Sequence, residues 1–270
     1  MSMSFSNQII QKVISDLSVP SEEPREALGN ALRLLAKWRS TLIQNTLLKN
    51  HGTKVLHGPL KGLDFLEQSS EGCHIAKLLG CYEQPLQPFI DKAIKSGYST
   101  IINIGCAEGY YAVGFARAMP EVISLAFDSD PQAQRNCRDL ALKNRVSDRV
   151  KVGGSFTHEE FTRFVNISAL VFCDIEGAED ELLDPSLAPA LKELDIIVES
   201  HECIRAGITQ RLISRFEATH DIQLVEDYGM RRLEEPPPWF AQMSHLDQLL
   251  ATWEWRSGPT PWLVMNARMK

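Results

Sequence analysis

The sequence predicts an α/β fold in which a doubly wound, mostly parallel sheet of seven strands carries an N-terminal helical cap. Two observations lead to this prediction. From Ser99 onward, short apolar runs alternate with helical patterns, and several runs are nearly continuous, as in strands that helices cover on both faces. The preceding residues show helical spacing and turns instead. We therefore expect a helical and hairpin accessory region at residues 1–80 and an α/β domain at residues 81–270.

Composition excludes several classes of protein and partner. Apolar residues make up 44% and charged residues 23%, which argues against wholesale disorder, a collagen-like fibre and a disulfide scaffold. The net charge of −7 disfavours nucleic acid as the main partner. Six cysteines without a CxxC pair indicate reduced thiols. The sequence has neither a secretory signal nor an apolar run of about 18 residues, so we expect a cytoplasmic protein with no membrane partner.

The first elements expected are a long helix, a hairpin and a second helix. Ser21 is a candidate N-cap for a helix that reaches about Lys49. Turn-forming residues at 57–62 lie between two short apolar pieces and predict a small hairpin, and a further helix is expected at Gln84–Ser96. Apolar residues of the long helix recur at spacings near 3.6, and we interpret this stripe as a packing face rather than a groove for a partner. The stripe consists of Leu28, Leu32, Leu35, Trp38, Leu42 and Leu47.

The α/β domain contains seven candidate strands. The proline-rich stretch at residues 234–240 separates the last two, and with Met230 it fits either an aromatic lid over an apolar acceptor or a rigid surface connection. The strands are Thr100–Ile104, Val122–Phe127, Val150–Val152, Ala169–Cys173, Asp195–Glu199, Ile222–Val225 and Trp262–Asn266. The helices between them are Tyr110–Met119, Pro131–Lys143, His158–Phe164, Ala178–Leu183 and Thr209–Thr219.

The strongest local signal is INIGCAEGYYAVGFA at residues 102–116. A buried strand ends at Ile104, Gly105 permits a sharp turn, and the small residues Ala107 and Gly109 let a ligand approach the backbone before a helix begins. This arrangement predicts a loop that binds a nucleotide cofactor, although a tight turn alone also occurs without a ligand. The dinucleotide pattern GxGxxG needs glycine at positions 107 and 110, where the chain has alanine and Tyr110, so a pyrophosphate is disfavoured.

An acidic residue stands at the end of the second strand. Asp128 follows the glycine turn by about 20 residues, where a carboxylate can accept hydrogen bonds from both hydroxyls of a ribose. Asp130 precedes Pro131 and is better explained as the N-cap of the next helix. Asp128 is therefore the candidate ligand.

Acidic residues and one histidine follow the fourth and fifth strands, at the edge where open α/β sheets bind ligands. Asp174 and Glu176 can face a substrate or a sulfonium cation, whereas Glu179 has a competing explanation in the dipole of the next helix. His201 can accept a proton from a substrate hydroxyl, although a histidine at a strand end is more often structural. Asp174, His201 and Glu202 also offer ligands for a divalent ion, but no dense ligand spacing is present, and we expect no metal centre.

Three of these segments together resemble the class I S-adenosylmethionine-dependent methyltransferases. They are GCAEGYYAVG, AFDSDP and DIEGAE, and the last is similar to the FkbM-type family. The resemblance covers about Tyr82 to His201 and implies a Rossmann-like methyltransferase fold, S-adenosyl-L-methionine as cofactor and a methyl-transfer centre beside Asp174 and Glu176, with His201 as the candidate base. Asn103 departs from the acidic residue usual at its position. The implied cofactor-binding residues are Tyr82, Glu83, Asn103, Gly105, Cys106, Ala107, Glu108, Gly109, Tyr110, Asp128, Ser129, Ser155, Phe156 and Asp174.

The resemblance also implies a class of acceptor. The Asx-Pro-Pro-aromatic loop of many amine methylases is absent, and DIEG stands in its place, so oxygen is the preferred acceptor atom. FkbM-like proteins commonly methylate hydroxyls on sugars or natural products, which implies a small-molecule or saccharide substrate. A nicotinamide-dependent oxidoreductase, a regulatory subunit that binds the cofactor without catalysis, and a nucleic-acid or protein methyltransferase are the alternatives. The sequence does not determine the oligomeric state.

Overall fold

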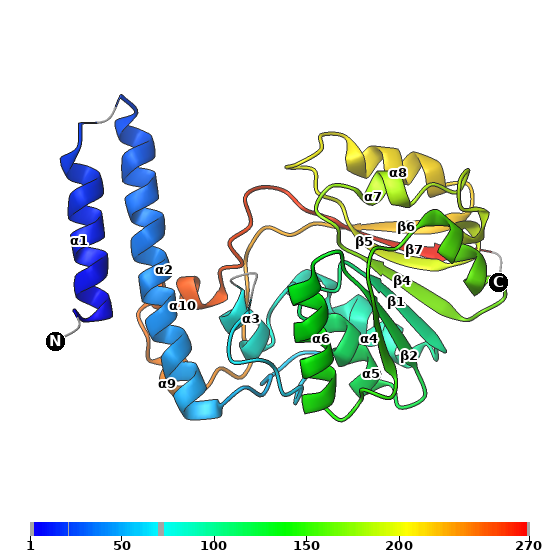
Figure 1. The fold of residues 1–270 in the computed structure, drawn as a ribbon, viewed down its shortest axis with the longest axis horizontal. Coiled ribbons are helices and arrows are strands. Elements are labelled where there is room, and N and C mark those ends of the chain that lie inside the picture. Colours follow the sequence, from blue (N-terminus) through cyan, green and yellow to red (C-terminus); the bar gives the residue numbers. More distant parts are fainter. Residues whose placement is uncertain (1–2, 21, 70–72, 269–270) are drawn as a thin grey trace.

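Seven strands form one sheet in the computed structural model, which describes residues 3–20, 22–69 and 73–268 (Figure 1). The strand order is β3-β2-β1-β4-β5-β7-β6; β7 is antiparallel to both neighbours, and all other pairs are parallel. The expected mostly parallel, doubly wound sheet is confirmed. Its strands are β1 (Thr100–Ile104), β2 (Ile123–Phe127), β3 (Val150–Gly153), β4 (Ala169–Cys173), β5 (Asp195–Glu199), β6 (His220–Val225) and β7 (Trp262–Ala267).

Helices cover both faces of the sheet (Figure 1). Because successive strand residues point to opposite faces, Ile101 packs into one apolar core and Ile102 into the other. The first face carries the turn η1 (Gln84–Leu86) and the helices α4 (Gln87–Lys95), α5 (Tyr110–Ala118) and α6 (Pro131–Lys143). The second carries α7 (Glu179–Leu182), α8 (Ile208–Phe216) and the 3₁₀ turns η2 (His158–Phe164) and η3 (Pro189–Lys192).

The N-terminal region is helical, and the chain between β6 and β7 adds to it. The connection from β6 leaves the sheet, forms two short helices beside the N-terminal ones and returns as β7 (Figure 1). Arg39 and Asp247 join the two parts through paired hydrogen bonds of 2.6 Å. The helices are α1 (Phe5–Ser18), α2 (Pro24–His51), α3 (His74–Leu79), α9 (Pro238–Ala241) and α10 (His245–Thr252).

Several expectations for this region need correction. The candidate cap Ser21 lies outside the described residues, and α2 begins at Pro24 with Glu23 as its N-cap. The expected hairpin is reduced to one bridge, between Lys54 and Asp64. Neither α1 nor α3 was among the expected elements. The proline-rich stretch forms α9, whose Trp239 donates a hydrogen bond to His51 on α2 at 2.7 Å, so this indole is anchored to the cap.

The leucine stripe of α2 is a packing face only in its second half. Leu47 is fully buried, but Leu28, Leu32 and Leu35 are 61%, 70% and 41% exposed. The interpretation of the whole stripe as packing is therefore wrong for its first three leucines. The reason is geometric, because the first half of α2 extends away from the sheet with α1 beside it (Figure 1). Within the described ranges, no helix has both the length and the apolarity needed to cross a bilayer.

Candidate functional site

The loop after β1 is packed against its neighbours as closely as a backbone permits. Gly105 has a φ of +78°, and a Cβ at this position would lie 1.6 Å from the backbone oxygen of Asp174, so only glycine fits. Ala107 has a φ of +45°, a strained value for a residue with a side chain. Gly109 precedes α5 with a φ of +91°. Such strain is concentrated at ligand sites in proteins, which supports the predicted role of the loop.

Asp128 closes this loop from the end of β2. Its Oδ2 accepts a hydrogen bond from the backbone N–H of Ala107 at 2.9 Å, and its Oδ1 accepts one from the N–H of Asp130 at 2.8 Å. A carboxylate oxygen can accept a second hydrogen bond, so Asp128 retains capacity for a ligand. Asp130 is confirmed as an N-cap, because its side chain accepts from the N–H groups of Gln132 and Ala133.

A cavity of about 630 Å³ opens at the carboxyl ends of β1, β2 and β4. This is the crevice at which open α/β sheets bind ligands, and the volume lies within the usual range of small-molecule sites. Seven of the predicted cofactor residues line it: Gly105, Ala107, Asp128, Ser129, Ser155, Phe156 and Asp174. The sequence did not single out the apolar wall formed by Ile175, Ala178 and Leu182, nor His158 and Glu181 beside it.

The other predicted cofactor residues do not line this cavity. Glu108 forms a buried ion pair with Lys77 at 3.0 Å, and the Lys77 ammonium also lies over the rings of Tyr82 and Tyr110. The structure thus places these side chains in packing positions beside α3. The remaining predicted residues outside the cavity lining are Glu83, Asn103, Cys106 and Gly109.

Asn103 is buried on β1, and its Nδ2 donates to the backbone oxygen of Phe172 at 3.4 Å. Its Oδ1 is buried with no hydrogen-bond partner among the described residues. A buried acceptor of this kind is costly, and a ligand that brings an N–H donor would satisfy it. An ammonium group meets this requirement.

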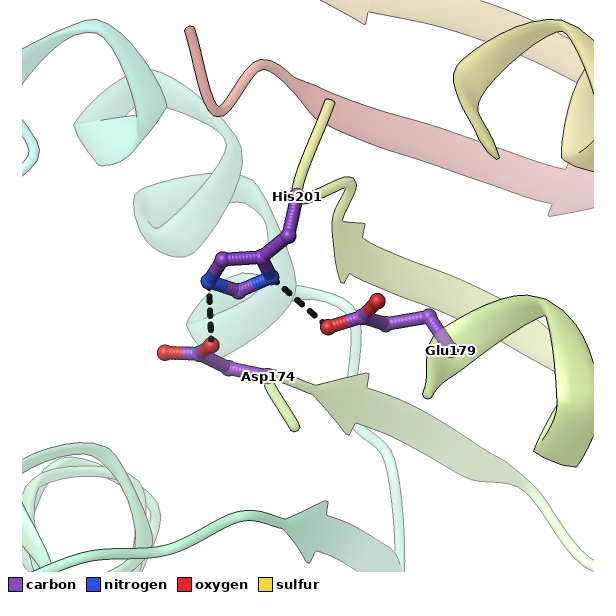
Figure 2. A group of neighbouring side chains, drawn as sticks. All are labelled: Asp174, Glu179 and His201. Carbon is purple, nitrogen blue, oxygen red and sulfur yellow. Dashed lines mark hydrogen bonds and ion pairs between the residues drawn. The ribbon is translucent and has the colours of Figure 1, made fainter. Parts of the chain in front are cut away.

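His201, which follows β5, is surrounded by carboxylates (Figure 2). Its Nδ1 lies 2.7 Å from Oε1 of Glu179, and its Nε2 lies 3.6 Å from Oδ1 of Asp174. Carboxylate oxygens of Glu176 and Glu199 lie 3.3 Å and 3.6 Å from the same Nε2. Only 4% of His201 is exposed. The three predicted catalytic residues Asp174, Glu176 and His201 are therefore brought together.

The electrostatics of this cluster fix the orientation of the imidazole. Burial lowers the pKa of His201, but the hydrogen bond to Glu179 and the charge of Glu199 outweigh burial, and the pKa is raised above 6.5. Burial raises the pKa of Glu179, but the bond to His201 and the Gly177 amide outweigh it, and that pKa is lowered. An ionised carboxylate can only accept, so Nδ1 donates and Nε2 is directed toward Asp174.

Glu179 is the main site residue that the sequence analysis left out. Its wholly buried carboxylate accepts hydrogen bonds from the N–H groups of Ile175 and Gly177, both at 3.1 Å, in addition to the one from His201. It therefore shapes the turn after β4 as well as the imidazole. Helix-dipole reasoning considered only its position at the start of α7 and gave no sign of these partners.

The candidate metal ligands also differ from those considered in the sequence. Glu202 accepts hydrogen bonds from the N–H and the hydroxyl of Thr209 at 3.2 Å and 2.9 Å, so it caps α8 and does not join the cluster. Among the described residues, two groups have ligand atoms within 4.8 Å of one another and could hold a metal ion. They are Asp174, Glu179 and His201, and Glu83, Asp174 and Glu199.

A half-buried arginine, also missed, connects this edge of the sheet to distant segments. Arg256 forms an ion pair with Glu83 at 3.0 Å and a second with Glu199, and it also contacts Glu254 at 3.2 Å. Burial and the neighbouring charge of Glu199 raise the pKa of Glu83 to about 8, against the effect of Arg256. Carboxylate oxygens of Glu83, Asp174 and Glu199 lie within 4.8 Å of one another, so Glu83 belongs to the same network of charges as Asp174.

Comparison with known proteins gives only similarity of fold. No protein-family model and no curated protein matches the chain. The O-methyltransferase TomG from Streptomyces achromogenes, solved with S-adenosylmethionine, is 12% identical over 65% of this chain and 76% of its own, with a TM-score of 0.46. The O-methyltransferase from Bacillus cereus, solved with S-adenosylhomocysteine, is 12% identical over 96% and 97%, with a TM-score of 0.45. Precorrin-6y C5,15-methyltransferase from Geobacter metallireducens is 14% identical over 64% and 81%, with a TM-score of 0.42.

The chain has a Rossmann-like methyltransferase fold. This assignment follows from its own strand order and from the antiparallel β7. Within the fold, the cavity, the carboxylate of Asp128 and the cluster around His201 all lie at the carboxyl ends of the parallel strands. The arrangement offers a nucleoside-sized cavity, a partner for a diol and a proton acceptor beside it.

Proposed function

We propose that this protein is an S-adenosylmethionine-dependent methyltransferase that methylates a hydroxyl group of a small molecule or saccharide. The observation that carries the proposal is the cavity at the sheet switch point, with Asp128 on one side and Asp174 and Glu176 on another. Because this fold is compatible with many activities, these residues, and not the fold, support the proposed function.

The residues present fit the cofactor. The cavity has the size of a small-molecule site, and Gly105 keeps the backbone side of the loop free of side chains. Asp128 retains hydrogen-bonding capacity for the ribose hydroxyls. Ser155 and Phe156 line the same cavity, which supports their proposed contact with the adenine. Asp174 and Glu176 offer negative charge toward a sulfonium.

The chain's contribution to the reaction is positioning and proton removal. Bound S-adenosylmethionine supplies an electrophilic methyl group on a positively charged sulfur. The acceptor hydroxyl must lie in line with the bond between the methyl carbon and the sulfur, and Asp174 and Glu176 border that part of the cavity. Holding the two reactants in this geometry lowers the entropic part of the barrier. His201 Nε2 accepts the hydroxyl proton as oxygen attacks, and Glu179 stabilises the imidazolium through Nδ1.

The loop after β1 favours this proposal over a nicotinamide-dependent oxidoreductase. A dinucleotide site needs glycine where the chain has Ala107 and Tyr110. Tyr110 is buried against α3 and lies outside the cavity lining, so the position where that pattern has its last glycine contributes nothing to the cavity. A regulatory subunit would have the same cofactor cavity, and only a measured transfer of methyl distinguishes it from an enzyme.

Two measurements on the full chain test the proposal. Isothermal titration calorimetry should show saturable binding of S-adenosylhomocysteine and no binding of NAD. Transfer from S-adenosyl[methyl-³H]methionine to a panel of sugars and phenols should then give a tritiated O-methyl product. Binding of NAD in place of S-adenosylhomocysteine overturns the assignment of cofactor. Cofactor binding without transfer to any hydroxyl acceptor contradicts the O-methyltransferase and favours the regulatory subunit.

A further inference from the structure

The most unusual surface of the protein lies on the hairpin of α1 and α2, which projects away from the sheet (Figure 1). None of the 14 residues of α1 is buried. Its Ile10, Ile14 and Leu17 are 51%, 54% and 43% exposed. An isolated helix of this length is marginally stable in water, and helices in proteins are stabilised mostly by burying an apolar face. The single chain leaves this face uncovered.

The exposed residues follow the spacing of a helix seam. On α1, Ile10, Ile14 and Leu17 are separated by four and three residues, and on α2, Leu28, Leu32 and Leu35 repeat the same pattern. The contact with α2 uses a neighbouring face of α1, where Ser6, Ile9 and Val13 are half-buried. Trp38 of α2 donates a hydrogen bond to Ser6 there at 3.1 Å. Alternation of four and three is the pattern of core positions where one helix packs against another.

A glycine lies next to the exposed stripe of α2. Gly29 follows Leu28 in the helix interior, where glycine is destabilising relative to alanine, and no atom lies within 4 Å of a Cβ built there. In the single chain, Gly29 therefore adds no stabilising contact to α2. A second helix crossing α2 at Gly29 would approach closely, which gives the glycine a packing reason.

Charge argues against a lipid surface as the occupant. Helices that lie on membranes carry lysine and arginine around the apolar face. The sole basic residue of α1, Lys12, forms an ion pair with Asp16 at 2.7 Å. Around the hairpin tip, the three glutamates Glu22, Glu23 and Glu26 outnumber Arg25, so anionic headgroups are repelled there.

We propose that the α1–α2 hairpin is a self-association surface, on which two copies of this chain pair around a two-fold axis as an antiparallel four-helix bundle. The hairpin offers the same stripe from each copy, as an isologous contact requires. With the axis near Gly29, Leu28 of one copy meets Leu32 of the other, and the exposed Glu26 of each copy lies near the exposed Arg33 of the other. The apolar and the charged pairings therefore agree on one register.

Sedimentation equilibrium of the full chain at micromolar concentrations tests the proposal. The wild type should sediment with twice its mass of 30.4 kDa. Leu32→Glu should sediment as a monomer with an unchanged far-UV circular dichroism spectrum, because the carboxylate is exposed in the single chain but buried in the pair. Leu187→Glu is the matched control. Leu187 is 63% exposed but lies between α7 and η3, against the sheet and not on the hairpin, so this variant should remain a dimer.

A second variant separates pairing from folding of the helix. Gly29→Gln should increase helicity at dilution, because glutamine favours helix over glycine, and should weaken dimerisation because its side chain blocks the crossing. A monomeric wild type overturns the proposal, and so does a Leu32→Glu variant that remains dimeric. The proposal is also overturned if wild-type monomer sediments with phosphatidylglycerol vesicles and Leu32→Glu does not. That result would assign the stripe to a lipid surface.

Discussion

Asp128 has two functions, and asparagine would lose part of each, because its amide nitrogen cannot accept a hydrogen bond from a backbone N–H. Its carboxylate holds the backbone of Ala107 and Asp130 and is proposed to accept the ribose hydroxyls. Asp128→Asn should weaken binding of S-adenosylhomocysteine by about 1.5–3 kcal/mol, which is roughly 10- to 150-fold, because it removes a charged acceptor. Isothermal titration calorimetry measures this effect, and a urea melt checks that the fold is retained.

The control for this variant is two residues away. Asp130→Asn removes the same charge, but Asp130 lies outside the cavity lining, and asparagine is an equally good N-cap. Its affinity for S-adenosylhomocysteine should stay within twofold of the wild type, within the scatter expected for a surface change. Equal affinities in both variants would remove Asp128 from the cofactor site.

His201 should give the reaction a pH dependence. A base must be neutral to accept a proton, and the pKa of His201 is raised above 6.5, so kcat should fall as pH decreases through that raised value. His201→Ala should lower kcat by about 10²–10⁴-fold and leave cofactor affinity nearly unchanged. A kcat independent of pH between 5 and 8, or normal turnover in His201→Ala, contradicts the role of base.

Glu179 is a positioning residue in the same argument. Glu179→Gln removes the charge that raises the pKa of His201 and keeps an oxygen acceptor for Nδ1. The acidic limb of the plot of kcat against pH should therefore move to lower pH. Initial rates at saturating substrate in a series of buffers measure this shift. Glu181→Gln is the control, because Glu181 forms an ion pair with Arg205 and not with His201, and its limb should not move.

Single residues were predictable from sequence where their chemistry depends on neighbours along the chain. Asp128 and Asp174 were found because they follow apolar strands at a known distance from a glycine turn. Glu179 and Arg256 were not, because their decisive partners, His201 and Glu199, are 22 and 57 residues away. Pairings across such separations exist only in the folded chain.

At the scale of elements, the strands were more predictable than the helices of the cap. β1, β4 and β5 have the expected bounds, because buried parallel strands are short apolar runs between polar residues. The helix α1 was missed because its apolar stripe is short, and none of its residues is buried in the single chain. The helices α9 and α10 were missed because four and eight residues are too few to show a helical repeat.

The β1–α5 loop should be the least tolerant element. Gly105→Ala places a Cβ 1.6 Å from the backbone oxygen of Asp174, directly after β4, and forces a positive φ on alanine. It should therefore lower the free energy of unfolding by roughly 2–5 kcal/mol. Gly97→Ala is matched, because Gly97 also has a positive φ of 73° but nothing within 4 Å of its Cβ. It should cost only about 1–2 kcal/mol in urea melts. If Gly105→Ala and Gly97→Ala lowered the free energy of unfolding equally, backbone strain alone, and not the contact with Asp174, would explain the requirement for glycine at residue 105.

The whole molecule is joined at the site by buried charges from distant segments. Glu83 precedes α4, Glu199 ends β5, and Glu254 and Arg256 come from the chain that returns to β7. These contacts connect the segment before η1, the end of β5 and the excursion between β6 and β7 at one place. Buried charges of this kind are stable only as a set, since removal of one partner leaves another uncompensated.

Stability should therefore depend on pH through Glu83. An unfolded glutamate loses its proton near pH 4.5, whereas the folded protein holds the Glu83 proton up to about pH 8. Between these values the native state binds more protons, so the free energy of unfolding falls as pH rises. Glu83→Gln, which has no proton to lose, should show a shallower decline between pH 5 and pH 8 in urea melts, and the remaining slope should include the contribution of His201. Glu121→Gln, an exposed substitution, should follow the wild-type slope. Parallel slopes for Glu83→Gln and the wild type would mean that Glu83 is already ionised in the native protein and that Arg256 compensates it fully.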